Sequence, residues 1–133
     1  MTIVHHELCF GCGLANLFGL QLEVERDGER SVAGRFFVKQ DHQGPPGYAH
    51  GGVLATALDE AMALLVHDAG VSALTRRLEV DLLAPAPIGA FATVRAWVEE
   101  DAERTLTLAA ELRSEGAADA VAARARGVFT RVS

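Results

Sequence analysis

Apolar and polar residues alternate near the start of the chain, in the order expected of a β-hairpin. Between residues 20 and 25 every second residue is apolar, which is the period-two pattern of a half-buried strand. Asp27-Gly28 follows as a strong turn signal, and 31–38 then reads as the returning strand. The next segment, 41–48, contains Gly44-Pro45-Pro46-Gly47, so we expect a loop there.

A long apolar stretch follows this loop and predicts a buried helix. It covers 51–69, with Gly70 placed to end the helix. The stretch is apolar almost all round, so other elements should wrap it. Asp59 and Glu60 lie near its centre, and two adjacent carboxylates would be very costly in lipid. We therefore expect a buried helix of a soluble protein rather than a membrane span.

After the helix the pattern returns to period two and predicts four more strands. Apolar residues alternate in four runs, 78–82, 92–98, 106–112 and 121–129, with turns expected at 100–103 and 115–118. One long helix and about six strands predict an α+β fold in which an antiparallel sheet curls around the helix. A single helix cannot cover both faces of such a sheet, so apolar residues such as Phe91 and Trp97 predict an oligomer.

Composition limits the class of protein. The 133 residues fit one domain covering 1–133, and half of them are apolar, which gives enough material for a core. A formal net charge of −6 argues against nucleic acid as a partner, although a few arginines can still hold the phosphates of a CoA-like ligand. The opening residues are too few and too polar for a signal peptide, and only two cysteines occur, so we expect a reducing cytoplasm.

The arrangement best suited to catalysis is His50-Gly51-Gly52 followed by Asp59. Two glycines at a helix start leave backbone N–H groups open at the positive end of the helix dipole, where they can stabilise a developing oxyanion. Asp59 lies two turns further along, where a carboxylate can act as a base or a nucleophile. From these residues alone a structural alternative stays open, in which the glycines permit tight packing and Asp59 caps a neighbouring element.

Several motifs are spread along nearly the whole chain. They are Cys9-Phe10-Gly11-Cys12-Gly13 with Asn16 and Gly19-Leu20, the loop 42–47, the segments 50–56 and 58–62, Thr75, and the strand ending at Pro85. Together they resemble the hotdog-fold thioesterase superfamily, particularly its 4-hydroxybenzoyl-CoA and phenylacetyl-CoA (PaaI-like) thioesterase branch. The resemblance implies a hotdog fold, with about six antiparallel strands wrapped around one long central helix.

The resemblance also implies roles for residues of the helix. Asp59 matches the catalytic carboxylate, which serves as general base or nucleophile. Gly51, with Gly52 as a second candidate, matches the backbone N–H that polarises the thioester carbonyl. His50 matches a group that orients the thioester or the water.

Two candidates outside the helix follow from the same resemblance. Thr75 matches a Ser or Thr from the neighbouring subunit that positions the water. Gln43 lies in the loop that orients the thioester or water, but the family's Asn or Gln stands about six residues before the histidine, where this chain has Gly44. Gln43 would therefore act through a shifted loop, or the role would be missing.

Glu60, Arg76 and Arg77 are candidates for substrate binding. Glu60 competes with its neighbour for the catalytic role, but adjacent helix residues point about 100° apart, and the family spacing favours Asp59. At most one of the two arginines would face the phosphates of CoA, because neighbouring strand residues point in opposite directions. The alternative for them is a solvated arginine or an ion pair on the strand, with Glu79 or Asp81.

Cys9 and Cys12, with His5 and His6 nearby, offer four possible zinc ligands within eight residues. No second cysteine pair follows, and the two histidines are adjacent near the start of the chain. Packing of the N-terminal segment is therefore the favoured interpretation, and we expect no metal and no other cofactor. A redox role is not favoured either, because no strand-then-helix pattern places the pair at a helix start.

The sequence thus predicts an acyl-CoA thioesterase for a small or medium acyl group, aromatic groups included. Its partners would be an acyl-CoA or acyl-carrier thioester and further copies of the chain, as a homodimer or homotetramer, with no membrane. Two rivals remain. A non-catalytic acyl-thioester binding module is kept open by Gly44, and a hotdog hydratase or dehydratase would use a His–acid pair that the order of residues here does not match.

Overall fold

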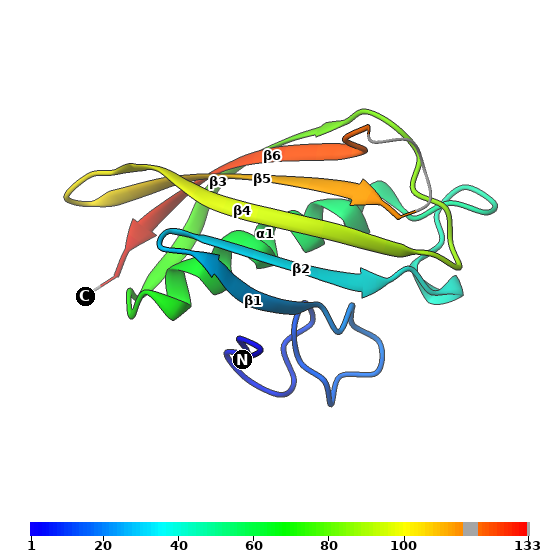
Figure 1. Cartoon of the computed structure of the whole chain (residues 1–133), viewed down its shortest axis with the longest axis horizontal. Coiled ribbons are helices and arrows are strands. Elements are labelled where there is room, and N and C mark those ends of the chain that lie inside the picture. The colour runs from blue at the N-terminus through cyan, green and yellow to red at the C-terminus, as the bar shows by residue number, and fades with distance from the viewer. Residues whose placement is uncertain (116–119, 133) are drawn as a thin grey trace.

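The structure is a computed structural model that describes residues 1–115 and 120–132. Within these residues the chain forms six strands, one long helix and one 3-10 helix, in the order drawn in Figure 1. The strands are β1 (Glu23–Gly28), β2 (Ser31–Phe37), β3 (Ala73–Leu82), β4 (Phe91–Asp101), β5 (Thr105–Ser114) and β6 (Ala123–Arg131). The helices are η1 (Gln40–His42) and α1 (Gly51–Asp68).

The strands form one sheet in the order β1-β2-β4-β5-β6-β3, and every neighbouring pair is antiparallel. The hairpin expected at Asp27-Gly28 is present, with Gly28 opposite Ser31. α1 stands between β2 and β3 in the chain and lies along one face of the sheet (Figure 1). The predicted α+β arrangement of an antiparallel sheet around one helix is confirmed.

Small residues let α1 lie close to the sheet. Ala57 and Ala61 are fully buried in the interface between the helix and the sheet. A side-chain carbon on Gly127 of β6 would lie 3.0 Å from Cε of Met62, so glycine makes room for that methionine. None of the described helices is both long and apolar enough to cross a membrane.

The first strand starts later than its apolar pattern suggests. Leu20 and Leu22 are buried as predicted, but β1 begins only at Glu23. Gln21 has a positive φ of 53°, which interrupts the extended backbone between the two leucines. The alternation of apolar residues therefore predicted the buried residues correctly and the start of the strand wrongly.

The other boundaries differ in smaller ways. β3 begins at Ala73, before the alternation that starts at residue 78, because it is an edge strand whose first residues are mostly exposed on both faces. β4 continues to Asp101, into the segment where a turn was expected. The helix ends as predicted, with Gly70 at a φ of +76°. The turn expected at 115–118 lies outside the described residues, apart from Glu115.

The N-terminal segment, 1–22, is fixed to the rest of the fold by backbone hydrogen bonds. Ile3 N–H donates to the carbonyl of Val24, which extends the edge of the sheet beyond β1. Further along, Leu20 N–H donates to Phe10 O and Leu22 N–H donates to Gly11 O, each at 2.9 Å. These bonds hold the loop around Gly11 against the middle of α1.

Candidate active site

His50 caps the amino end of α1 with its side chain. Its backbone is extended, and its Nδ1 accepts the N–H of Gly52 at 2.8 Å. The lack of a side chain on Gly52 permits this, because a Cβ there would lie 3.1 Å from the same Nδ1. A neutral ring that accepts at Nδ1 carries its proton on Nε2, which gives the site one imidazole N–H donor.

Gly51 carries the open donor at this helix end. The N–H groups of Val53 and Leu54 both reach the carbonyl of His50, and that of Gly52 reaches the His50 ring. The N–H of Gly51 has no acceptor among the described residues. Two glycines were expected to polarise a carbonyl. The N–H of Gly51 is available to a ligand, whereas the N–H of Gly52 is already hydrogen-bonded to the His50 ring.

Asp59 lies on the side of α1 that faces β3. Its Oδ1 accepts the hydroxyl proton of Thr75 at 2.7 Å, and the carboxylate is half-buried. Thr75 was expected to act from a neighbouring subunit, but here it contacts Asp59 of its own chain. Two facing elements thus supply a carboxylate and a hydroxyl as one unit.

The loop before the helix is fixed by its own hydrogen bonds. Oε1 of Gln43 accepts the N–H of Gly47 at 2.7 Å, so this oxygen closes the loop. The absence of a side chain at Gly44 has a physical reason, because a Cβ there would lie 2.7 Å from the Cα of His50. The buried ring of His42 lies under the loop, where its Nδ1 accepts the N–H of Lys39 at 3.0 Å.

The two arginines of β3 have different surroundings. Nε of Arg77 forms an ion pair with Glu79 at 2.9 Å, which is one of the alternatives that the sequence left open. Arg76 is exposed and makes no ion pair within the described residues. A bulge between Thr75 and Arg77 shifts the register with β6, so the alternation assumed for this strand does not hold there.

Glu60 points away from the surface that contains Asp59. Only 9% of the residue is exposed, and its Oε2 lies 3.3 Å from Nδ1 of His5 and 3.4 Å from Sγ of Cys9. Gly11 lies directly over it, since a Cβ at that position would come within 2.4 Å of Glu60 Cγ. The structure thus encloses Glu60 under the N-terminal segment instead of leaving it open to a substrate near Asp59.

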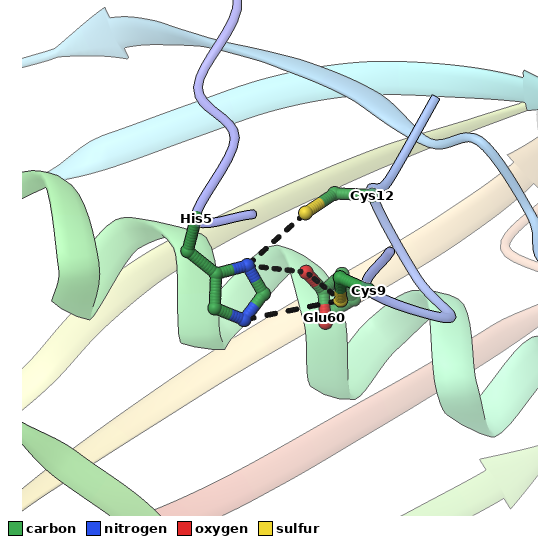
Figure 2. Close-up of side chains that lie close together, drawn as sticks. All are labelled: His5, Cys9, Cys12 and Glu60. Carbon is green, nitrogen blue, oxygen red and sulfur yellow. Dashed lines mark hydrogen bonds and ion pairs between the residues drawn. The ribbon is translucent and has the colours of Figure 1, made fainter. Parts of the chain in front are cut away.

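His5, Cys9, Cys12 and Glu60 come together in one cluster, drawn in Figure 2. The sequence had suggested the first three with His6, but His6 is not part of the cluster and Glu60 takes its place. Burial raises the pKa of the Cys12 thiol to about 12, and the nearby carboxylate adds to this effect. Without a bound cation this thiol therefore stays protonated, unlike a reactive redox cysteine.

An apolar cleft of about 380 Å³ extends from this cluster towards β3. Both His5 and Thr75 line it, and Ala63, Leu74 and Phe129 are among the other lining residues. The cleft is therefore bounded in part by Thr75, the residue whose hydroxyl donates to Asp59.

Comparison with known proteins relates the chain to thioesterases. A family model of the thioesterase superfamily matches residues 46–121. A mutant structure of the phenylacetic acid degradation protein PaaI from Thermus thermophilus is 30% identical, with a TM-score of 0.75 over 85% of this chain and 95% of that one. A search among curated proteins gives no match.

Two further structures have similar folds. A thioesterase superfamily protein is 25% identical, with a TM-score of 0.85 over 93% of this chain, which spans 60% of that protein's length. A hypothetical thioesterase from Streptococcus pneumoniae, solved with coenzyme A, is 18% identical, with a TM-score of 0.77 over 84% of this chain and 86% of that one. Alanine mutants of the Streptococcus protein, at an aspartate and at a threonine sixteen positions later, match with the same TM-score.

Proposed function

The chain belongs to the thioesterase superfamily, and from this premise we propose that it hydrolyses an acyl-CoA thioester between Gly51 and Asp59. The observation that carries the proposal is the open N–H of Gly51 at the start of α1, together with the half-buried carboxylate of Asp59, which a second copy of the chain can bring to that N–H. Family membership confirms the predicted class, a thioester hydrolase with a PaaI-like fold. The substrate and the roles of the residues are what we propose here.

The chemistry follows from where charge develops. When an oxygen nucleophile adds to the thioester carbon, the carbonyl oxygen becomes negative, and the N–H of Gly51 at the positive end of α1 stabilises it. Asp59 either takes a proton from the attacking water or attacks the carbon itself and forms an anhydride that water opens. In both routes the C–S bond breaks, the thiol leaves with a proton, and the acid is released.

Helix geometry indicates that one site needs two chains. Gly51 and Asp59 are eight residues apart, which is about 12 Å along the helix axis. One carbonyl group cannot contact both, since reacting atoms must approach within about 3–3.5 Å. We therefore propose that Gly51 of one subunit faces Asp59 and Thr75 of another. In this arrangement Thr75 still acts from a neighbouring subunit, seen from the Gly51 that binds the carbonyl. It does so together with Asp59 of its own chain.

The edge of the sheet supports this assembly. β3 ends the strand order, so one row of its backbone groups has no neighbouring strand in the described chain. Leu74 and Leu82 on this strand are more than half exposed. Exposed leucines on an edge strand favour pairing with a second copy, and we propose a homodimer or a dimer of dimers.

The pairing of Asp59 with Thr75 has a parallel in the Streptococcus pneumoniae thioesterase. The aspartate and threonine replaced in that protein are sixteen positions apart, and Asp59 and Thr75 have the same separation. The residue types and spacing support a joint role for the pair. We propose that Thr75 holds the carboxylate of Asp59 towards the water.

Two relatives support the class of substrate. The Streptococcus protein was solved with coenzyme A, and the 30% identical relative is named as a phenylacetic acid degradation protein. We propose a CoA thioester of a small or aromatic acid, with the acyl group near the apolar cleft beside Thr75. Arg76 remains the candidate for the CoA phosphates, because Arg77 is already paired with Glu79. The reaction would run in a reducing cytoplasm, with residues 1–133 acting as one domain.

Thiol release from aromatic, short and long acyl-CoAs tests the proposal. We expect Asp59→Asn to lower kcat by about 10²- to 10⁴-fold, with an unchanged unfolding midpoint. Asp81→Asn is the matched control, because Asp81 is an exposed carboxylate of β3 outside the site, and it should keep the wild-type rate. Thiol release that survives Asp59→Asn would contradict the assignment.

The same assay separates the rival functions. Acyl-CoA binding without thiol release from any substrate would favour the non-catalytic binding module, for which the engaged Gln43 oxygen and Gly44 are the supporting features. Addition or removal of water at a double bond, without thiol, would indicate a hydratase or dehydratase.

A further inference from the structure

The cluster under the N-terminal segment has the composition of a metal site. One imidazole, two thiols and one carboxylate converge so that one donor atom of each lies within 4.8 Å of all the others. Figure 2 shows that three of these side chains come from the N-terminal segment and Glu60 comes from α1. None of these four side chains takes part in the bond-making and bond-breaking steps of the proposed hydrolysis, although His5 also lines the cleft beside Thr75.

Three distances between ligand atoms in the cluster are close to those that a tetrahedral metal imposes on its ligands. Nδ1 of His5 lies 3.1 Å from Sγ of Cys12 and 3.3 Å from Oε2 of Glu60. Sγ of Cys9 lies 3.4 Å from the same Oε2. Zinc bonds of about 2.0–2.3 Å at tetrahedral angles would separate neighbouring ligand atoms by about 3.3–3.8 Å. Two of these three distances lie within this range, and a small shift of His5 away from Cys12 would bring the third into it.

We propose that His5, Cys9, Cys12 and Glu60 form a structural zinc site that fixes the N-terminal segment to α1. Two sulfurs and an imidazole favour zinc over the hard cations magnesium and calcium, which take oxygen ligands. Four protein ligands close the coordination sphere, as in structural zinc sites, whereas catalytic sites leave one position for water.

The charge of Glu60 supports a bound cation. A buried carboxylate is costly unless it is paired, and the only basic group paired with Glu60 among the described residues is His5. When zinc binds, Cys9 and Cys12 each lose a proton to solvent, and the metal forms four bonds to nitrogen, oxygen and two sulfurs. Two thiolates and one carboxylate then balance the charge of the metal to a net −1.

The backbone arranges these ligands without the metal. The bond from Ile3 N–H to Val24 O places the chain just before His5. Gly13 N–H donates to Cys9 O at 2.9 Å and closes the turn that contains both cysteines. At Gly11 the backbone passes so close to Glu60 that no side chain fits between them. A turn shaped in this way has little to rearrange when it takes up an ion.

Zinc analysis of the full chain tests the inference. The protein is reduced, reconstituted with zinc chloride, freed of excess metal and analysed by mass spectrometry for metal content. We expect about one zinc per chain, and we expect Cys12→Ser and His5→Ala each to weaken zinc binding by more than about 100-fold. His6→Ala is the matched control, since His6 is the adjacent histidine outside the cluster, and it should keep the metal.

A second measurement covers the case in which a variant fails to fold. Cobalt(II) added to the reduced, metal-free wild type should give the near-ultraviolet absorption of thiolate bound to cobalt, and zinc should remove it by competition. A wild type that binds neither zinc nor cobalt would overturn the proposal. So would zinc content that survives replacement of both cysteines by serine. Neither measurement depends on thioesterase activity. The zinc site can therefore be refuted without refuting the proposed hydrolysis, and the hydrolysis can be refuted without refuting the zinc site.

Discussion

Two neighbouring carboxylates on α1 have opposite environments. Asp59 faces β3, is half-buried, and accepts one hydroxyl hydrogen bond from Thr75. Glu60, one residue later, is enclosed under the N-terminal segment between an imidazole and a thiol. The 100° turn between successive helix residues is sufficient to separate a surface open to substrate from a closed, sulfur-rich one.

The comparison shows what an acidic residue in an apolar helix can be used for. On the β3 side the carboxylate is only half-buried and is hydrogen-bonded to Thr75, which lines an open cleft, and a base or nucleophile needs such access to water. On the other side two cysteines and a histidine replace water around the carboxylate, which suits a cation. The position in the helix does not decide between these roles, but the elements packed against each side do.

Removal of a single N–H tests the catalytic side most strongly. Gly51 is the first residue of the helix, a position that accepts proline. The extended backbone of His50 also suits a following proline, so Gly51→Pro removes the N–H without breaking the helix. We expect Gly51→Pro to lower kcat by about 10²- to 10³-fold. Gly51→Ala is the control, because it introduces the same Cβ near Leu82 and keeps the N–H. Equal rates in the two variants would exclude the oxyanion role.

A pair of glycine substitutions separates the two sides of the helix. In Gly11→Ala the new Cβ would overlap the side chain of Glu60, so we expect a loss of about 1–3 kcal/mol in unfolding free energy together with weaker zinc binding. In Gly44→Ala the Cβ would overlap the backbone of His50, so we expect kcat to fall about tenfold or more. Thermal unfolding, zinc content and thiol release measure the three effects. Identical profiles for the two variants would mean that the two sides are not separate.

Removal of the Thr75 hydroxyl should have a smaller effect on catalysis. Thr75→Val keeps the shape of the side chain but leaves Asp59 Oδ1 without its donor. We expect a loss of about tenfold in kcat, which corresponds to about 1.4 kcal/mol, with unchanged zinc content. Thr93→Val is the control, because its hydroxyl donates to the carbonyl of Arg113 on the neighbouring strand, outside the site. A full rate in Thr75→Val would leave Thr75 with a structural role only.

The smallest expected effect is a pH dependence on the catalytic side. Burial lowers the pKa of His42 below its ordinary value of 6.5, so the folded protein keeps the ring neutral while the unfolded chain takes up a proton. The stability due to the neutral ring is therefore present above pH 6.5 and is lost as the pH falls below it. Denaturant unfolding with chelator present should show this loss in the wild type and a shallower one in His42→Gln. If the unfolding free energy falls equally with decreasing pH in the wild type and in His42→Gln, other groups cause the acid sensitivity.

The fold could be predicted from periodicity because most of its elements bury one face. Apolar spacing alone predicted the long helix to within one residue of its end and the succession of two strands, one helix and four strands along the chain. Two boundaries could not be predicted, for local reasons. The positive φ of Gln21 interrupts a segment whose burial still alternates, and the start of β3 is an edge position with no buried face to produce a pattern.

The site could be predicted only where its residues are close in the sequence. His50, Gly51 and Asp59 lie on one helix, so spacing and family resemblance identify them together. The partners of Glu60 lie far earlier in the chain, at Cys9 and His5, and no helical or strand period connects them. Likewise, the bond between Thr75 and Asp59 depends on how β3 packs against α1, which the sequence does not show.

The central claim is that the adjacent carboxylates have separate roles, and the most direct test measures both roles in both variants. Asp59→Asn and Glu60→Gln each remove one negative charge at almost constant size. Thiol release from a phenylacetyl-CoA substrate and zinc content are measured for each variant. We expect Asp59→Asn to lose activity and keep its zinc, and Glu60→Gln to bind zinc weakly while it retains most of the rate when zinc is in excess. Loss of activity in Glu60→Gln at saturating zinc, with a normal rate in Asp59→Asn, would contradict the account.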